Sequence, residues 1–163
     1  MFTIHATRKL LDRVGYRLDG SIMASSTALG DWYATAFWKP RVALLVNERT
    51  LIPVLLPLAP ATTLIDRFPA VLGTVLEAHG IDREFIDAEL AAMSEGRYAK
   101  TTNRSTVGVM NEFAFLAGSH RAEHGINDLL NLALELADTP CGPLYQRHIT
   151  PVAELQAMVA SPS

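Results

Sequence analysis

The residues best suited to chemistry lie in one polar segment, residues 100–111, in the second half of the chain. The segment combines two cations with hydroxyl and amide side chains, and its pattern predicts that a helix begins there. A helix N-terminus has unpaired N–H groups and a partial positive charge, so it can hold a phosphate or a carboxylate. We predict that Arg104 is a catalytic cation and that the ligand is bound by Lys100, Thr101, Asn103, Ser105 and Asn111.

Gly108 gives this predicted helix an open position on its polar side. If the helix has begun by Arg104, then Arg104, Gly108 and Asn111 share one face, because they are spaced i, i+4 and i+7. Glycine lowers helix propensity, so it is costly unless a ligand or a neighbouring strand must come close. The alternative is an ordinary helix cap, in which Arg104 pairs with an acidic residue and Gly108 admits a neighbouring backbone. The glycine spacing of a P-loop is absent.

A second polar group forms the turn Asn47–Arg49, between two apolar runs. We predict that Glu48 is a catalytic general base or acid, that Arg49 contacts the anion, and that Asn47 also binds the ligand. Asp31 is a further ligand-binding candidate. It precedes two aromatic residues that could stack on a base, or pack in the core with their polar tips satisfied. The alternative for residues 47–49 is an ordinary solvated turn.

The segment His120–His124 has the form H-x-x-E-H, the inverted zinc-protease motif. Two histidines at i and i+4 share a helix face and can bind zinc, so metal-dependent hydrolysis is an alternative. The segment lies where the helix is expected to end, however, and nothing marks a third ligand. The single cysteine, Cys141, excludes an internal disulfide and lies in a predicted turn. We therefore assign no metal ligand and no cofactor.

The elements that must position these residues include an antiparallel meander. Three runs of six to seven residues with short polar breaks predict its strands, at residues 32–38, 41–46 and 51–56. A helix over residues 30–38 is the alternative for the first run, because a short apolar run does not settle its own period. Residues 2–5 alternate and predict a short strand, and residues 8–14 predict a helix capped by Thr7.

The second half of the chain is predicted to be helical. Residues 64–76 keep an apolar stripe of helical period, with a kink or restart at Pro69 and an end at Gly80. A second helix is predicted to follow the cap Asp82, and a third to run from a cap at residue 103 or 105 to about residue 120. A fourth is predicted over residues 126–137, and a short fifth begins at Pro151. The sequence thus predicts an α+β fold, with a small antiparallel sheet covered by a helical C-terminal half, in one domain spanning residues 1–163.

Composition limits the partners of this chain. Of 163 residues, 49% are hydrophobic and 19% are charged, which excludes a long disordered segment. Fourteen basic and seventeen acidic residues give a net charge of −3, which argues against a dedicated duplex-binding protein. Residues 97–104 nevertheless contain three basic and no acidic residues, so an anionic ligand or RNA at one face is allowed. The apolar runs are too short to span a membrane, and residues 1–8 show no secretory signal, so we expect a cytoplasmic protein without membrane contact.

Three motifs resemble those of one family. Residues 29–33 read LGDWY, residues 45–57 read LVNERTLIPVLLP, and residues 100–113 read KTTNRSTVGVMNEF. They are similar to the LGDWY, VNERTLLPVLLP and KTxNRSxxGxMNDF patterns of small bacterial proteins defined only as a domain of unknown function. Glu112 stands where that pattern has Asp. The resemblance covers most of the chain and implies that the turn at Asn47 and the helix start at Asn103 belong together, without implying an activity.

Three classes of function therefore remain open, and the third of them is the metal-dependent hydrolysis through His120 and His124 described above. The first is a small polar site that binds an anionic, phosphate-bearing ligand, and its extension is a toxin-like ribonuclease with Glu48 as base. The second is a non-enzymatic interaction module, either a homodimer or a partner of the toxin–antitoxin type. A shared site requires Glu48 and Arg104 to lie within about 15 Å of each other, since longer gaps exceed the reach of two side chains.

Overall fold

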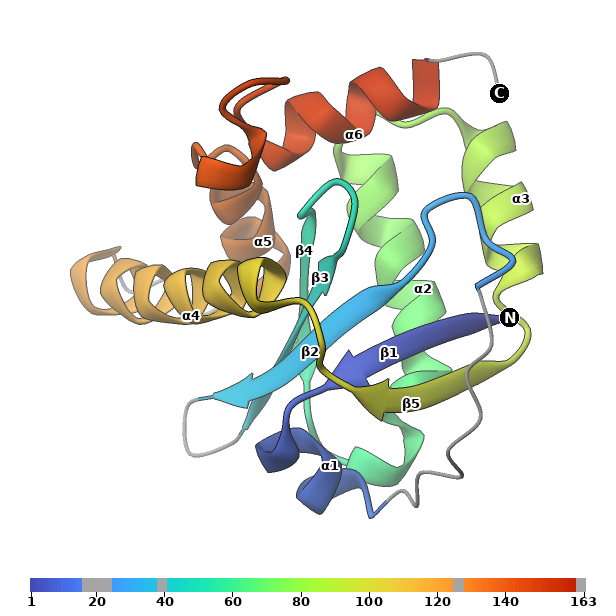
Figure 1. Cartoon of the computed structure of the whole chain (residues 1–163), viewed down its shortest axis with the longest axis vertical. Coiled ribbons are helices and arrows are strands. Elements are labelled where there is room, and N and C mark those ends of the chain that lie inside the picture. Colours follow the sequence, from blue (N-terminus) through green and yellow to red (C-terminus); the bar gives the residue numbers. More distant parts are fainter. Residues whose placement is uncertain (16–24, 38–40, 125–127, 161–163) are drawn as a thin grey trace.

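The strands form one mixed sheet of five, in the order β4-β3-β2-β1-β5 (Figure 1). The computed structural model describes residues 1–15, 25–37, 41–124 and 128–160, with backbone only over 120–124. The predicted meander is confirmed, because adjacent strands pair antiparallel through β2 (Trp32–Phe37), β3 (Val42–Asn47) and β4 (Pro53–Pro57). The first run is therefore a strand, and the helical alternative for it is wrong.

The α+β fold is confirmed, and two further strands with parallel pairing extend the predicted antiparallel meander into a mixed sheet. The strand β1 (Phe2–Ala6) lies beside β2 and parallel to it. The edge strand β5 (Gly96–Lys100) was not predicted, and it pairs parallel to β1 on the other side. A parallel pair needs a long crossover, and here helices provide it on both sides of β1.

One face of the sheet is covered by three helices, α1 (Arg8–Val14), α2 (Leu64–Ala78) and α3 (Arg83–Ala92). Their apolar residues pack with alternate residues of the strands in one buried core, which includes Ile4, Trp32, Leu45, Phe68, Leu72 and Ile86. The helix α2 runs through Pro69 without the predicted restart. Pro69 lies in its second turn, so the missing N–H leaves a single carbonyl near the helix start without its usual donor. The predicted cap at Asp82 is confirmed by its hydrogen bond from the Phe85 N–H, at 3.0 Å.

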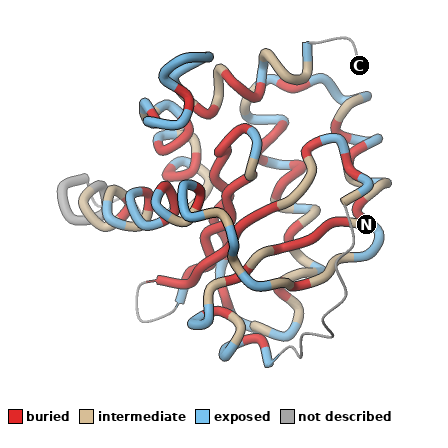
Figure 2. The backbone as a smooth tube through the Cα atoms, viewed as in Figure 1, coloured by how far each residue is buried: buried red, intermediate tan, exposed pale blue. Residues whose placement is uncertain are grey.

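The opposite face is covered only in part. The helix α4 (Arg104–His124) lies over β2 and β3, and α5 (Leu129–Ala137) lies over β4. Their core includes Tyr33, Leu44, Val46, Met110, Phe113 and Leu132. In Figure 1 no described helix lies over β1 and β5 on this side, and Figure 2 shows half-buried and exposed residues along β5. This uncovered half of the face carries Thr3, His5 and Arg97, by strand alternation and register.

The last described element is α6 (Pro151–Ala160), which begins at the proline as predicted. The preceding helix α5 is capped by Asp128 and begins at Leu129, three residues later than predicted. Among the described residues, no helix combines the length and apolar character needed to cross a membrane.

Candidate functional site

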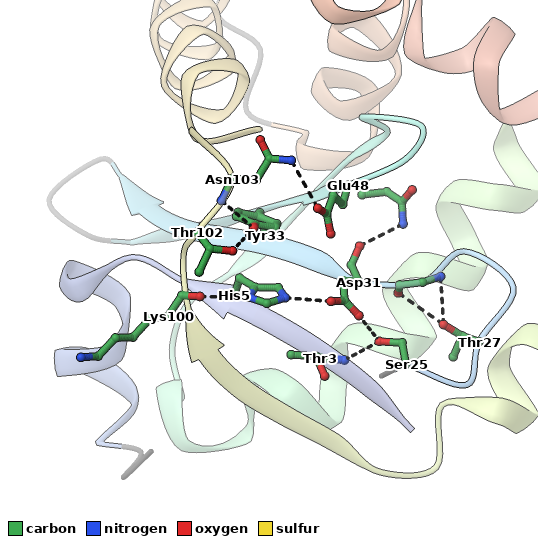
Figure 3. A network of polar contacts seen from close by, with 12 residues as sticks. Thr3, His5, Ser25, Thr27, Asp31, Tyr33, Glu48, Lys100, Thr102 and Asn103 are labelled. Atoms are coloured by element: carbon green, nitrogen blue, oxygen red, sulfur yellow. Dashed lines mark hydrogen bonds and ion pairs between the residues drawn. The ribbon is translucent and has the colours of Figure 1, made fainter. Parts of the chain in front are cut away.

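The segment after β5 brings the two predicted motifs together. From Lys100 the chain crosses the uncovered face over β1 and β2 and begins α4 at Arg104 (Figure 3). The buried Tyr33 fixes this crossing, because its hydroxyl accepts a hydrogen bond from the Asn103 N–H at 2.9 Å. Asn103 Nδ2 then donates to Glu48 Oε1 at 3.3 Å, across 55 positions of sequence. Arg104 follows Asn103 in the chain, so the proximity that a shared site requires is met.

Two buried polar residues, which we call the anchor pair, hold the neighbouring loop at residues 27–31. The side chain of Asn47 is fully buried, and its amide donates to the Leu29 carbonyl at 2.9 Å while its oxygen accepts from the backbone of Arg49 and Thr50. The carboxylate of Glu89, on α3, accepts from the backbone N–H groups of Ala28 and Leu29 at 2.8 and 3.0 Å. The polar atoms of the pair form hydrogen bonds with the backbone of this loop, and we therefore interpret both residues as positioning the loop.

A half-buried group lies at the end of this loop, and we call it the polar cluster. It consists of His5, Asp31, Glu48 and Asn103. The Nε2 atom of His5 lies 2.8 Å from Asp31 Oδ2, and its Nδ1 lies 2.9 Å from the Lys100 carbonyl oxygen. The imidazole stacks on Tyr33, with ring centroids 4.7 Å apart. The other Asp31 oxygen accepts a short hydrogen bond from Ser25, whose oxygen accepts from the Thr3 N–H. Each side chain of the cluster is therefore oriented by a neighbour.

The atoms of the cluster are suited to hydrogen bonding and to holding an ion. Side-chain exposure is 16% for His5 and 27% for Asp31, so both meet solvent while remaining partly desolvated. Both ring nitrogens of His5 face oxygens that act as acceptors, and with Asp31 ionised only the doubly protonated imidazolium donates to both. One ligand atom from each of His5, Asp31 and Glu48 lies within 4.8 Å of the others. Among the described residues, these three form the group of histidine and acidic side chains that lie close enough together to hold a metal ion.

Among the described residues, three groups outside the cluster have shifted pKa values: burial lowers the pKa of His79, and the other two groups are Glu89 and Cys141. Burial raises the pKa of Glu89, and the hydrogen bonds from Leu29 and Ala28 oppose that shift. Burial, and then the charge of Glu112, raise the pKa of the Cys141 thiol to about 11. Cys141 is therefore held as a protonated thiol at neutral pH and packs in the core beneath α4, which argues against its use as a nucleophile.

The predicted site residues occupy three kinds of position. Asp31, Glu48 and Asn103 belong to the polar cluster, whereas Asn47 belongs to the anchor pair and we interpret it as a positioning residue. Arg49 is exposed beside the loop, and its Nη1 donates to the Ala28 carbonyl at 3.3 Å. Lys100 contributes its carbonyl oxygen, while its side chain points away from His5 in Figure 3.

The remaining predicted residues surround the start of α4. Thr101 is half-buried, and Arg104, Ser105 and Asn111 are exposed. A Cβ on Gly108 would meet nothing within 4 Å, so the alternative in which it admits a neighbouring backbone is wrong for the described part of the chain. The side chains of His120 and His124 lie outside the described residues.

Sequence reasoning missed His5 and the supporting hydroxyls of Tyr33 and Thr102, which are 3.2 Å apart. Strand alternation could have found the histidine, because Thr3 and His5 are the polar positions of an otherwise apolar strand. The aromatic residues after Asp31 are core residues, as one of the two predictions held, but the polar tip is satisfied only for Tyr33: among the described residues, the buried Trp32 indole nitrogen has no hydrogen-bond partner. Trp32 packs against Phe68 on the opposite face, and Tyr33 is buried beside α4.

Comparison with known proteins gives one match. A family model described as a domain of unknown function, DUF6933, matches residues 3–154. Neither the curated proteins nor the solved structures contain a match to the chain.

Proposed function

The chain belongs to the family described as a domain of unknown function (DUF6933), and we propose that its polar cluster and the start of α4 bind a phosphate-bearing ligand. The observation that carries the proposal is the hydrogen bond from Asn103 to Glu48, 3.3 Å long. It joins two polar segments on the sheet face that α4 and α5 cover only in part. Polar side chains from distant segments that converge on a half-buried surface are typical of a ligand site.

The start of α4 supplies donors for an anion. The Asn103 side chain caps the helix by accepting from the Thr106 N–H at 3.1 Å. Among the described hydrogen bonds, the N–H groups of Arg104 and Ser105 have no acceptor, and both residues are exposed. In a helix of 21 residues these groups carry the positive end of the helix dipole. The Arg104 guanidinium adds a charge suited to bidentate phosphate contacts.

We extend the proposal to RNA as the ligand, in a toxin-like ribonuclease. Glu48 would accept the proton of a ribose 2′-hydroxyl, and the oxygen would attack the adjacent phosphorus. The bond from phosphorus to the 5′-oxygen would break, and that oxygen would take a proton from water. Arg104 would stabilise the negative charge that builds on the phosphate in the transition state. The products would be a 2′,3′-cyclic phosphate and a 5′-hydroxyl end.

Binding and cleavage can be tested with a labelled single-stranded oligoribonucleotide. We expect Arg104→Ala to weaken binding about tenfold, which corresponds to about 1.4 kcal/mol. The matched control is Arg41→Ala, an exposed arginine next to the β2–β3 turn. Glu48→Gln should keep binding and lose cleavage. Equal affinities for both arginine variants, or unfolding of Arg104→Ala, would contradict the site. Binding without cleavage by the wild type would limit the proposal to ligand binding.

One observation favours the alternative of an interaction module. Phe115, on α4, is 76% exposed, the largest value among the described large hydrophobic residues. In Figure 1 its helix projects beyond the edge of the sheet. A homodimer, or an antitoxin-type partner in the cytoplasm, could cover such a residue. Sedimentation tests the homodimer: a concentration-dependent dimer that Phe115→Ser abolishes would support it, and a monomer at high concentration would count against it.

A further inference from the structure

We propose that His5, Asp31 and Glu48 form a binding site for one divalent transition-metal ion, Zn²⁺ or Mn²⁺. The three side chains come from the end of β1, the loop before β2 and the turn after β3 (Figure 3). The proposal concerns the metal alone and does not depend on a phosphate-bearing ligand.

The spacing of the donor atoms fits one ion. One nitrogen and two carboxylate oxygens lie within 4.8 Å of one another, and His5 Nε2 lies 2.8 Å from Asp31 Oδ2. Ligands bound at about 2.1 Å lie roughly 3.0–3.4 Å apart when they are adjacent around the metal. Small side-chain rotations therefore suffice to place all three around an ion. Because the residues are half-buried, solvent can reach the remaining coordination positions.

The partners of these side chains form an independent observation. The Lys100 carbonyl accepts from His5 Nδ1, which leaves the Nε2 lone pair of a neutral imidazole directed at Asp31. Ser25 donates a hydrogen bond to Asp31 Oδ1, the oxygen that does not face His5, and Asn103 donates one to Glu48 Oε1. Metal-binding histidines usually donate their second N–H to a carbonyl or carboxylate, and metal-binding carboxylates are themselves hydrogen-bonded. All three ligands here have such a partner.

Charge balance supports a cation at this position. Two carboxylates face the same partly desolvated space, and like charges at that distance repel each other. Among the described ion pairs, His5 is the single partner of Asp31, and it is positive only when its imidazole is protonated, whereas Glu48 has no partner there. A divalent ion would neutralise both carboxylates and take the place of the second imidazole proton.

The donor set also selects the kind of metal. Imidazole nitrogen favours zinc and other transition ions, and carboxylate oxygen suits manganese. Calcium takes six to eight oxygen ligands, and magnesium is held mainly by carboxylates and water, so a histidine is a poor choice for either. A mixed set of one nitrogen and two oxygens therefore points to Zn²⁺ or Mn²⁺.

The test is calorimetric titration of the metal-free full chain with ZnCl₂ and with MnCl₂. We expect one ion per chain for at least one of them, with affinity reduced at least about tenfold by Asp31→Asn and by Glu48→Gln. Asp66→Asn is the matched carboxylate control, because Asp66 is exposed on α2. The double variant His120→Gln, His124→Gln removes the competing histidine motif and should bind as the wild type does.

Two results would overturn the site. One is the absence of stoichiometric binding of either metal. The other is binding that is lost in the His120, His124 double variant and retained in Glu48→Gln. Should Asp31→Asn fail to fold, Mn²⁺ added to the wild type gives a test without mutation. In proton NMR spectra recorded as Mn²⁺ is added, the ring resonances of His5 should broaden before those of His79. The reverse order would contradict the site. A metal result of either kind leaves phosphate binding, measured in EDTA, as a separate question.

Discussion

The anchor pair and the polar cluster both contact the loop at residues 27–31, but their polar groups are in opposite situations. Asn47 and Glu89 are almost completely buried, and their polar atoms meet backbone donors and acceptors. His5 and Asp31 are half-buried, and both ring nitrogens of His5 face acceptors. A buried polar group whose bonds are complete stabilises the fold. Asp31 and Glu48, by contrast, are partly exposed carboxylates that lie close together, so they can still interact with a ligand.

The largest predicted effect separates two neighbours in one turn. Asn47→Ala should lower the free energy of unfolding by about 3 kcal/mol, because it leaves several buried backbone groups without a partner. Glu48→Gln should change it by less than about 0.5 kcal/mol, since its side chain is half-exposed. Urea denaturation followed by circular dichroism measures both. If Glu48→Gln proved as costly as Asn47→Ala, the polar cluster would be a second structural anchor.

The contrast between these neighbours also marks where sequence reasoning stops. The polar turn at Asn47–Arg49 could be predicted because it separates two apolar strands. Which of its side chains points inward depends on the loop at residues 27–31, which is distant in sequence and supplies the carbonyl groups that Asn47 binds. The sequence therefore predicted which two segments converge and could not say which of their side chains are buried and which face solvent.

The fold shows the same limit. The meander and most helices were predicted because each shows its own apolar period or cap. The strand Gly96–Lys100 has a single fully buried residue, Tyr98, and no apolar run, so only its pairing with β1 makes it a strand. That pairing sends the chain across the sheet face and places Asn103 beside Glu48. The convergence that defines the site thus depends on the one strand that the sequence did not predict.

The next prediction uses pH to compare Glu89 with the open carboxylates. Burial raises the pKa of Glu89 above its ordinary value of 4.5, so the folded state keeps a proton that the unfolded state has released. The unfolded state then binds fewer protons, and the free energy of unfolding falls as pH rises through this window. Glu89→Gln should remove this part of the pH dependence. Denaturation midpoints between about pH 4 and pH 7 should therefore decline more in the wild type than in the variant.

Glu48→Gln is the matched control for that series, because Glu48 is the half-buried carboxylate of the polar cluster. It removes a carboxylate in the same way and leaves the loop contacts of Glu89 intact. A Glu89→Gln curve that is parallel to the wild type would show that Glu89 is not desolvated as the anchor role requires.

The smallest effect concerns Asn103, a member of the polar cluster that also caps a helix. Its oxygen caps α4 through the Thr106 N–H, and its nitrogen donates to Glu48. Asn103→Ala should lower the free energy of unfolding by about 1 kcal/mol through loss of the cap, whereas Asn103→Ser keeps a capping oxygen and should cost only a few tenths. Urea denaturation of the two variants separates these contributions. Because serine cannot reach Glu48 as asparagine does, an equal cost for both variants would mean that the contact with Glu48 stabilises the fold, and Glu48 would then belong with the anchor pair.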